Sequence, residues 1–133
     1  MDKAAFLARV GEYHENGWRL AIINATTVPS PDEATPGVFE ISWGFAKDLE
    51  FETMRESVTT ADEVPSVSEF FGAAFLYENE MRELFGINVT GIGLDLQGQL
   101  YKTSAKIPFS HAAVKARLEA TAAATAAASG KKA

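Results

Sequence analysis

Phe75–Val89, with the sequence FLYENEMRELFGINV, is the stretch that decides the fold of this chain of 133 residues. Its apolar residues recur at the three- and four-residue spacing of a helix, in which each residue turns by about 100°. We expect a helix that is capped by Ser66 or Ser68 and that ends at Phe85. One side of this helix should form a largely apolar stripe, which contains Phe71, Ala74, Phe75, Glu78, Met81, Arg82 and Phe85.

Two charged side chains lie within that apolar stripe. Glu78 precedes Arg82 by four residues, which is the favourable orientation for an ion pair on a helix. A charge on an apolar face must find a partner or shift its pKa. We therefore predict that Glu78 and Arg82 form one hydrogen-bonded unit that faces the core or a partner. Asn79, Glu80 and Glu83 should point elsewhere, toward water or toward another protein.

Gly86 marks the end of the predicted helix. It follows Leu84 and Phe85 at the position of a left-handed C-terminal cap, a conformation that glycine adopts without a Cβ penalty. Ile87–Ile92 should then form a brief extended segment. Beyond it, Asp95–Gly98 has the composition of a tight turn that joins two extended pieces and leads to Leu100-Tyr101.

The residues of this stretch resemble the signature of the C-type subunit of complex I (NADH-quinone oxidoreductase). They also resemble the corresponding small hydrophilic subunit of Ech-type energy-converting [NiFe] hydrogenases. In the signature a tyrosine precedes Glu-Arg-Glu, the helix ends in Leu-Phe-Gly-Ile, and an upstream segment matches Pro65-Ser66-Val67. The matching positions within the helix and its end are Tyr77, Glu78, Glu80, Leu84, Phe85, Gly86 and Ile87.

The chain departs from this signature at four places. Asn79 stands where the family has arginine, and Glu83 stands where it usually has aspartate. Arg82 occupies a position that is usually hydrophobic or aromatic. Gly91-Ile92 stands where complex I members tend to have Gly-His. Together with the short chain and its lack of cysteine, these departures favour the hydrogenase branch over the complex I branch.

The resemblance implies an assembly role. In the family, the C-type subunit has no cofactor and packs against the large catalytic subunit, so this chain would be a non-catalytic accessory subunit. Its complex would be a membrane-bound [NiFe] hydrogenase that couples ferredoxin-dependent H₂ evolution to ion translocation. The [NiFe] centre and the Fe-S clusters would belong to partner subunits.

The implied partners are the large [NiFe] hydrogenase-like subunit (or its D-type counterpart in complex I), small Fe-S subunits and membrane subunits. The chain would then be cytoplasmic and peripheral on the cytoplasmic side of the cell membrane. We expect the interface with the large subunit to use the signature and its polar flank, which are Tyr77, Glu78, Asn79, Glu80, Arg82, Glu83, Leu84, Phe85, Gly86 and Ile87.

Two alternatives remain open beside the hydrogenase interpretation. The first is the C-type subunit in the peripheral arm of complex I. The second is a free-standing acid-base enzyme that uses Glu78 and Glu80, because two carboxyl groups in different environments can act as acid and base. No histidine or nucleophile lies close to them in the sequence, which favours a structural or interface role. A regulatory binding module is a further possibility.

Composition excludes several classes of site. The chain has no cysteine, so disulfides, zinc-thiolate sites and cysteine-ligated Fe-S clusters are absent. Residues 1–95 contain 17 acidic and six basic residues, whereas residues 96–133 contain one acidic and six basic residues. An acidic body argues against nucleic-acid binding, because phosphate contacts need a basic surface. No apolar stretch approaches the ~20 residues of a membrane span, and no secretory signal pattern is present.

The remaining pattern predicts an α+β domain over residues 1–110. A small mixed or antiparallel sheet should be covered by helices mainly on one face. We expect a helix at Ala4–Glu15, a central strand covered on both faces at Trp18–Val28, and a loop at Pro29–Gly37. Two further strands should follow at Val38–Phe45 and Leu49–Thr60, with a turn at Lys47-Asp48.

Residues 111–133 should form an Ala/Lys-rich C-terminal helix or a disordered tail. Alanine gives residues 112–130 a strong helix propensity, but only Val114 and Leu118 provide an apolar stripe. We expect this segment to be helical only when docked and to be removable after Ser110 without unfolding the body. The last residues, 129–133, should be disordered.

Overall fold

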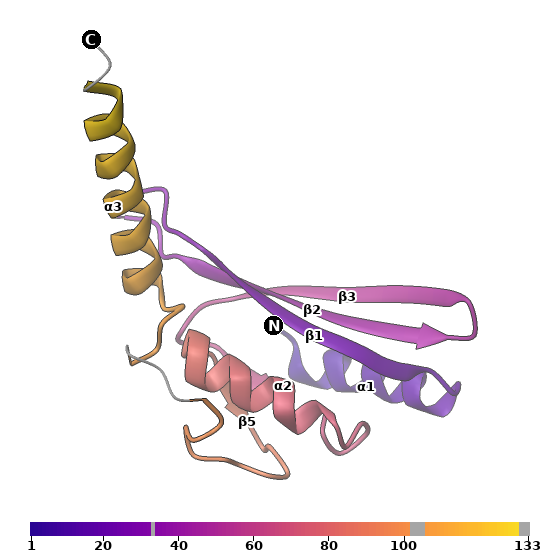
Figure 1. The fold of residues 1–133 in the computed structure, drawn as a ribbon. Coiled ribbons are helices and arrows are strands. Elements are labelled where there is room, and N and C mark those ends of the chain that lie inside the picture. The colour runs from indigo at the N-terminus through magenta and orange to yellow at the C-terminus, as the bar shows by residue number, and fades with distance from the viewer. Residues whose placement is uncertain (33, 102–105, 131–133) are drawn as a thin grey trace.

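The computed structural model describes residues 1–32, 34–101 and 106–130 of the chain. A three-stranded antiparallel sheet and a two-stranded parallel sheet pack with two helices, Lys3–Glu15 and Ala74–Glu80, that lie on the same side of the larger sheet (Figure 1). This arrangement confirms the predicted α+β class. The elements in chain order are α1 (Lys3–Glu15), β1 (Arg19–Val28), β2 (Val38–Lys47), β3 (Glu50–Val58), β4 (Glu63–Pro65), α2 (Ala74–Glu80), the π-helical segment η1 (Met81–Phe85), β5 (Asn88–Thr90) and α3 (His111–Gly130).

Helix α1 forms as its sequence predicts. The Asp2 side chain caps its first turn by accepting a hydrogen bond from the Ala5 N–H, at 3.2 Å. Its apolar residues Phe6, Val10 and Tyr13 recur at helical spacing and are all buried. The helix therefore covers one end of the sheet with a single apolar face.

The order of strands in the larger sheet is β1-β2-β3, so the prediction that Trp18–Val28 forms a central strand was wrong. Ile22 of β1 lies on the open face of the sheet and is partly exposed. It packs with Phe51 over Gly44, where an added Cβ would lie 2.6 Å from Phe51 Cζ and 2.9 Å from Ile22 Cγ2. Apolar residues occur on both faces of β1 because Ile22 helps to cover this glycine, not because a second layer covers the strand.

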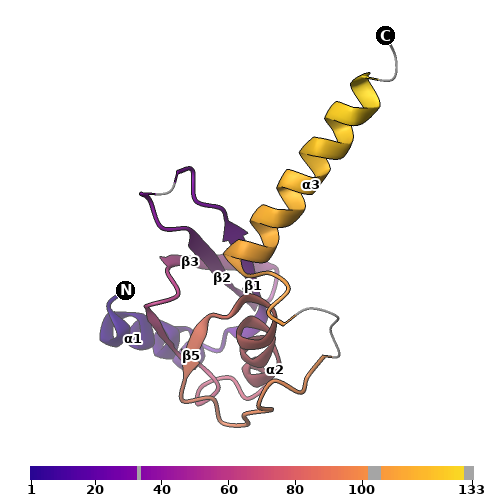
Figure 2. The same ribbon diagram turned by 90° about the vertical axis from the view of Figure 1, so that its left-hand side faces the viewer.

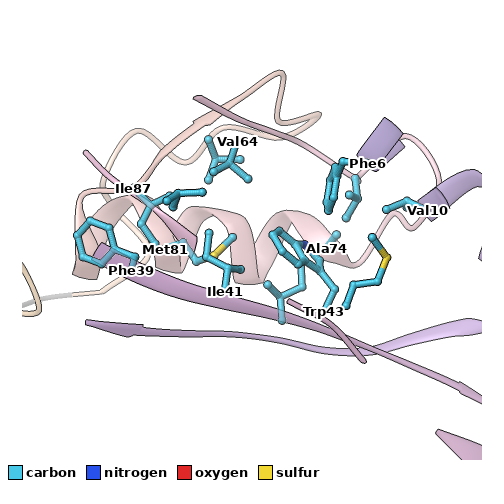
Figure 3. Packing of buried hydrophobic residues seen from close by; sticks show 14 of the residues in the cluster. Phe6, Val10, Phe39, Ile41, Trp43, Val64, Ala74, Met81 and Ile87 are labelled. Carbon is cyan, nitrogen blue, oxygen red and sulfur yellow. The ribbon is translucent and has the colours of Figure 1, made fainter. Parts of the chain in front are cut away.

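Strand β2 carries the centre of the core. Its alternating residues Phe39, Ile41, Trp43 and Phe45 are buried, whereas Glu40 faces solvent. Figure 3 shows the β2 side chains pointing toward Ala74 of α2 and Met81 of η1, with Val64 and Ile87 on the far side of the cluster. A strand was predicted here from the sequence and is confirmed, although Gly44 and Ala46 on its other face are also buried.

The hairpin between β2 and β3 turns one residue later than predicted. Lys47 pairs with Glu50, so Asp48 and Leu49 form the two-residue connection. Asp48 has a φ of 52°, a conformation that aspartate tolerates in tight hairpin turns. Strand β3 then directs Met54 into the core.

Strands β4 and β5 form a small parallel pair joined by α2 and η1. Glu63, Val64 and Pro65 pair with Asn88, Val89 and Thr90, respectively. Parallel neighbours need a crossover connection, and here the helical segment supplies it (Figure 2). The sequence did not predict β4, because three residues are too short to show an alternating pattern.

The predicted helix over 66–85 is shorter and less regular in the structure. Helix α2 begins at Ala74, because residues 66–73 form turns in which the Val67 carbonyl accepts hydrogen bonds from the N–H groups of Phe70 and Phe71. After Glu80 the helix widens into η1, whose π-helical turn contains one residue more than an α-helical turn. The 3.6-residue spacing assumed from the sequence therefore stops at this point.

The segment after β5 leads away as an irregular stretch, which we call the 91–101 loop. It contains a tight turn closed by a hydrogen bond of 3.1 Å from Gln99 N to Leu96 O. Gln97 and Gly98 have φ values of 52° and 76°, as a type I′ turn requires. The turn is one residue later than predicted, and no strand flanks it within residues 91–101.

The chain then returns to the body before α3. The Phe109 N–H donates to Leu84 O at 2.6 Å, and the Phe109 carbonyl accepts from Thr27 Oγ1 at 2.5 Å. His111 Nε2 donates to Val38 O at 2.9 Å, and its ring packs on Phe39 with the centroids 4.3 Å apart. Residues 106–111 therefore fasten the end of the sheet to η1.

Helix α3 extends from this attachment away from the sheet (Figures 1 and 2). Most of its side chains are exposed, and Val114 is half-buried. Residues 129 and 130, expected to be disordered, lie in this helix, whereas residues 131–133 lie outside the described chain. Whether the segment is helical only when docked stays a prediction.

These contacts make the result of C-terminal truncation depend on where the cut is made. Removal of all residues after Leu118 should lower the free energy of unfolding by less than about 0.5 kcal/mol, because little apolar area is lost. Removal after Ser110 also deletes His111 and Val114 and should cost about 1–2 kcal/mol. Urea denaturation of both truncations measures the difference. Equal stability of the two would show that His111 does not hold the body together.

Candidate interaction site at α2 and η1

Glu78 lies buried between α2 and the chain that leaves β4, with only 1% of its surface exposed. Its Oε2 accepts a hydrogen bond from Ser66 Oγ at 2.6 Å, and its Oε1 accepts one from Val67 N at 2.7 Å. Ser66 Oγ lies 2.7 Å from Ser68 Oγ, which in turn accepts a hydrogen bond of 3.0 Å from Gly93 N. One carboxylate therefore ties together α2, the end of β4 and the start of the 91–101 loop.

Burial dominates the acid-base behaviour of Glu78. Loss of water around the carboxyl group raises its pKa, while the hydrogen bonds from Ser66 and Val67 oppose the rise by stabilising the charged form. The net direction is upward. The fold thus favours the protonated acid more than water does.

The predicted pair of Glu78 and Arg82 does not form. Arg82 Nη1 donates instead to Asp95 Oδ2 in the 91–101 loop, at 2.6 Å and at a partly exposed position. This hydrogen bond from Arg82 lowers the pKa of Asp95 from its ordinary value. The prediction failed because both oxygens of Glu78 are already occupied by the chain after β4, and because Arg82 lies in η1, beyond the end of α2.

Asn79 does not point toward water or another protein, as the sequence had suggested. Its side chain is 2% exposed and uses both ends of its amide. Nδ2 donates to Phe75 O at 2.7 Å and to Leu94 O at 2.8 Å. Oδ1 accepts from Leu96 N at 2.9 Å. Asn79 therefore recognises the backbone of the 91–101 loop.

Glu83 is also bound to the loop backbone and is not a free acid. Its Oε2 accepts a hydrogen bond from Leu100 N at 2.7 Å, and its Oε1 accepts one from Tyr101 N at 3.0 Å. Glu80, by contrast, has no side-chain partner in the part of the chain that the structure describes. Of the three polar residues expected to face outward, two are therefore bound to the protein's own backbone.

Asn79, Arg82 and Glu83 together hold both ends of the 91–101 loop against α2 and η1. Figure 2 shows the orange segment after β5 running below these elements. This role could not be predicted from the sequence. The loop groups that Asn79 and Glu83 bind are backbone groups, and they lie 15 to 18 residues after those two side chains. Asp95 was the one available signal, as an acid that follows Arg82.

The apolar residues of the signature join the core. The Tyr77 hydroxyl donates to Ala21 O at 3.4 Å, where the pairing of β1 with β2 is irregular. Phe85 packs on Phe109 with ring centroids 5.1 Å apart. Ile87 is buried, and the Leu84 carbonyl accepts a hydrogen bond from the Phe109 N–H.

Gly86 ends the helical segment in the predicted left-handed conformation, with a φ of 75°. A Cβ at this position would lie 3.2 Å from Ile107 Cγ2. The glycine is therefore required both by the backbone turn and by the return of the chain toward α3.

The arrangement gives little support to acid-base catalysis by Glu78 and Glu80. Glu78 is inaccessible to a substrate, and two residues along a helix point about 200° apart. Within residues 1–32, 34–101 and 106–130, no group of three His, Cys, Asp or Glu side chains is placed to hold a metal ion. The site therefore consists of the buried carboxylate of Glu78 and the 91–101 loop, whose backbone is held by side chains of α2 and η1.

Residues 9–108 match the family described as "Respiratory-chain NADH dehydrogenase, 30 Kd subunit". The chain belongs to this family. The match runs from α1 through the 91–101 loop to the segment that returns to the sheet, so it includes the whole candidate site. No curated protein and no solved structure shows significant similarity to the chain.

Membership in the 30 Kd subunit family makes the chain a hydrophilic subunit of a complex of the NADH-quinone oxidoreductase type. It confirms the resemblance to the C-type subunit of complex I. Among the helices that the structure describes, none is long and apolar enough to cross a bilayer.

Glu78 should make the stability of this 30 Kd family member depend on pH. Because its pKa is raised in the fold, the stability it contributes is complete below its ordinary pKa of 4.5 and is lost as the pH rises through the folded-state pKa. Glu78→Gln should remove this dependence. Urea denaturation from about pH 4 to about pH 7 measures it. Glu119→Gln, at an exposed position on α3, is the control.

If wild type and Glu78→Gln show the same change in unfolding free energy with pH, Glu78 does not titrate between these limits. A parallel change in Glu119→Gln would assign the effect to the general loss of one negative charge.

Gly86→Ala should lower the free energy of unfolding more than the same substitution at another glycine with a left-handed conformation. Alanine at Gly86 meets both the backbone strain and the Ile107 side chain, for a loss of about 2 kcal/mol of unfolding free energy. Gly91 has a φ of 77° with nothing within 4 Å of its Cβ position, so Gly91→Ala should cost about 1 kcal/mol. Thermal and urea denaturation compare the two, and equal losses would mean that Ile107 moves aside freely.

Proposed function

We propose that this chain is a non-catalytic hydrophilic accessory subunit of a membrane-bound energy-converting [NiFe] hydrogenase and that it packs against the large catalytic subunit. The family match over residues 9–108 carries the proposal of a hydrophilic accessory subunit. The departures of the chain from the complex I signature carry the choice of the hydrogenase branch. In this proposal the complex evolves H₂ from reduced ferredoxin and translocates ions. The chain is peripheral on the cytoplasmic side of the membrane, attached through its partner subunits.

The redox centres of the proposed complex belong to other subunits. Fe-S clusters are held mainly by cysteine thiolates, and this chain has no cysteine. A [NiFe] centre in the large subunit and Fe-S clusters in small subunits would then carry the electrons. The role of this chain would be to hold neighbouring subunits in place.

One position supports the hydrogenase branch, because Ile92 follows Gly91 where complex I members tend to have histidine. Asn79 departs from the family as a whole, which has arginine at this position. The amide of Asn79 both donates to Leu94 O and accepts from Leu96 N. An arginine side chain has no hydrogen-bond acceptor and cannot make this pair of bonds. The hydrogen bonds that hold the 91–101 loop in this chain therefore differ from those that an arginine could make.

The C-type subunit of a complex I peripheral arm is the second candidate. It is favoured by the description of the matching family, which names the respiratory-chain NADH dehydrogenase. Both candidates place the chain beside a large catalytic subunit. They differ in the metal content and the reaction of that large partner.

The outer side of α2 is a secondary part of the proposed contact. Leu76 is partly exposed and Glu80 lies four residues later, so the two share one face of the helix. The rim of a protein interface is polar and exposed to solvent, and Glu80 would lie in such a rim. The buried residues of the signature pack on the opposite, core-facing side of α2.

Purification of the assembled complex tests the proposal. An affinity tag on the chain in its native host should recover a large subunit together with small Fe-S subunits and membrane subunits. Nickel in the preparation and H₂ evolution from reduced ferredoxin would support the hydrogenase. NADH-quinone oxidoreductase activity without nickel would support complex I instead.

The same experiment separates assembly from independent catalysis. The chain purified alone should be colourless and inactive. Recovery of the chain from its host as a monomer with turnover of its own would contradict both candidates and favour a free-standing enzyme.

A further inference from the structure

The 91–101 loop is fixed almost entirely through its main chain. Asn79 binds the carbonyl of Leu94 and the N–H of Leu96, and Glu83 binds the N–H groups of Leu100 and Tyr101. Near its start, Gly93 N donates to Ser68 Oγ. An irregular loop ordinarily keeps much of its conformational freedom, and this one has lost it at both ends.

The side chains of the loop are left largely in solvent. Leu94 is 53% exposed and Tyr101 is 48% exposed. Their backbone groups are among those bound by Asn79 and Glu83, yet their apolar surfaces add little to the core. The helical segment therefore displays two large side chains in a fixed geometry, which is how binding loops are commonly supported.

The residues of the loop itself carry little charge, although the body is acidic. Asp95 is the single charged residue between Gly91 and Tyr101. Its charge is compensated by Arg82 at 2.6 Å. A partner surface that fits this loop is therefore apolar, with a polar group to meet the Tyr101 hydroxyl.

We propose that the 91–101 loop is the recognition element of this subunit, and that Leu94 and Tyr101 insert into an apolar surface of the large catalytic subunit. This inference rests on the proposed function and names the part of the chain that makes the contact. Asn79 and Glu83 act as positioning residues. They order the loop before binding, so that association does not have to bear that entropic cost.

The test is co-purification of the large subunit with the tagged chain from its native host. The double variant Leu94→Ser/Tyr101→Ser should recover at least about tenfold less large subunit, since truncation of central interface anchors commonly costs that much in affinity. The melting temperature of the isolated variant should stay at the wild-type value, because both side chains are exposed. Leu118→Ser changes a leucine that is 55% exposed on α3 and should leave recovery unchanged.

Asn79→Ala tests the positioning role separately. It should speed hydrogen exchange at the Leu96 amide and also lower recovery of the large subunit, although residue 79 is buried and cannot touch a partner. Faster exchange with normal recovery would show that Asn79 serves the fold alone and would overturn this part of the proposal.

The outcomes distinguish the inference from the function on which it rests. If wild type recovers the large subunit and the double variant recovers as much, the loop is not the recognition element, while the proposed function stands. If wild type recovers no large subunit, the proposed function fails and the inference fails with it. A loss of recovery in Leu118→Ser as large as in the double variant would also overturn the loop proposal.

Discussion

The buried carboxylate of Glu78 is the interaction on which the rest of the domain depends. It binds Ser66 Oγ and Val67 N, immediately after β4 ends, from a position in the middle of α2. This pair of bonds sets the distance between the helix and the parallel strands. The hydroxyls of Ser66 and Ser68 extend this network to Gly93 N. The same carboxylate therefore also helps to fix the start of the 91–101 loop.

The helical segment that contains Glu78 has two different sides. One side buries Ala74 and Met81 against the central strand of the sheet. The other side presents Asn79, Arg82 and Glu83 to the 91–101 loop. Polar residues on a helix surface are usually interpreted as solvated or as facing a partner, and here they recognise the protein's own backbone. Asn79 and Glu83 are therefore used within the protein, whereas Leu94 and Tyr101 of the loop stay exposed.

The sequence predicted what is decided locally. The strand that begins at Val38 and the left-handed turn at Gly86 follow from rules that act over a few residues, and both were confirmed. The partners of Arg82 and Glu83 were not predictable, because they lie 13 to 18 residues away in a segment without periodicity. The position of β1 in the sheet was misjudged for the same reason. Ile22 is apolar because it packs over Gly44 on the neighbouring strand, and this contact cannot be inferred from β1 alone.

The attachment of Phe109 has a consequence for how the protein is made. Its carbonyl bonds to Thr27, 82 residues earlier, and its N–H bonds to the end of η1. Contacts between residues so distant in sequence form late, because a long loop must close first. On the ribosome the first strand and the ring of Phe85 must wait for most of the chain to emerge. The domain is therefore completed only after Phe109 has left the ribosome.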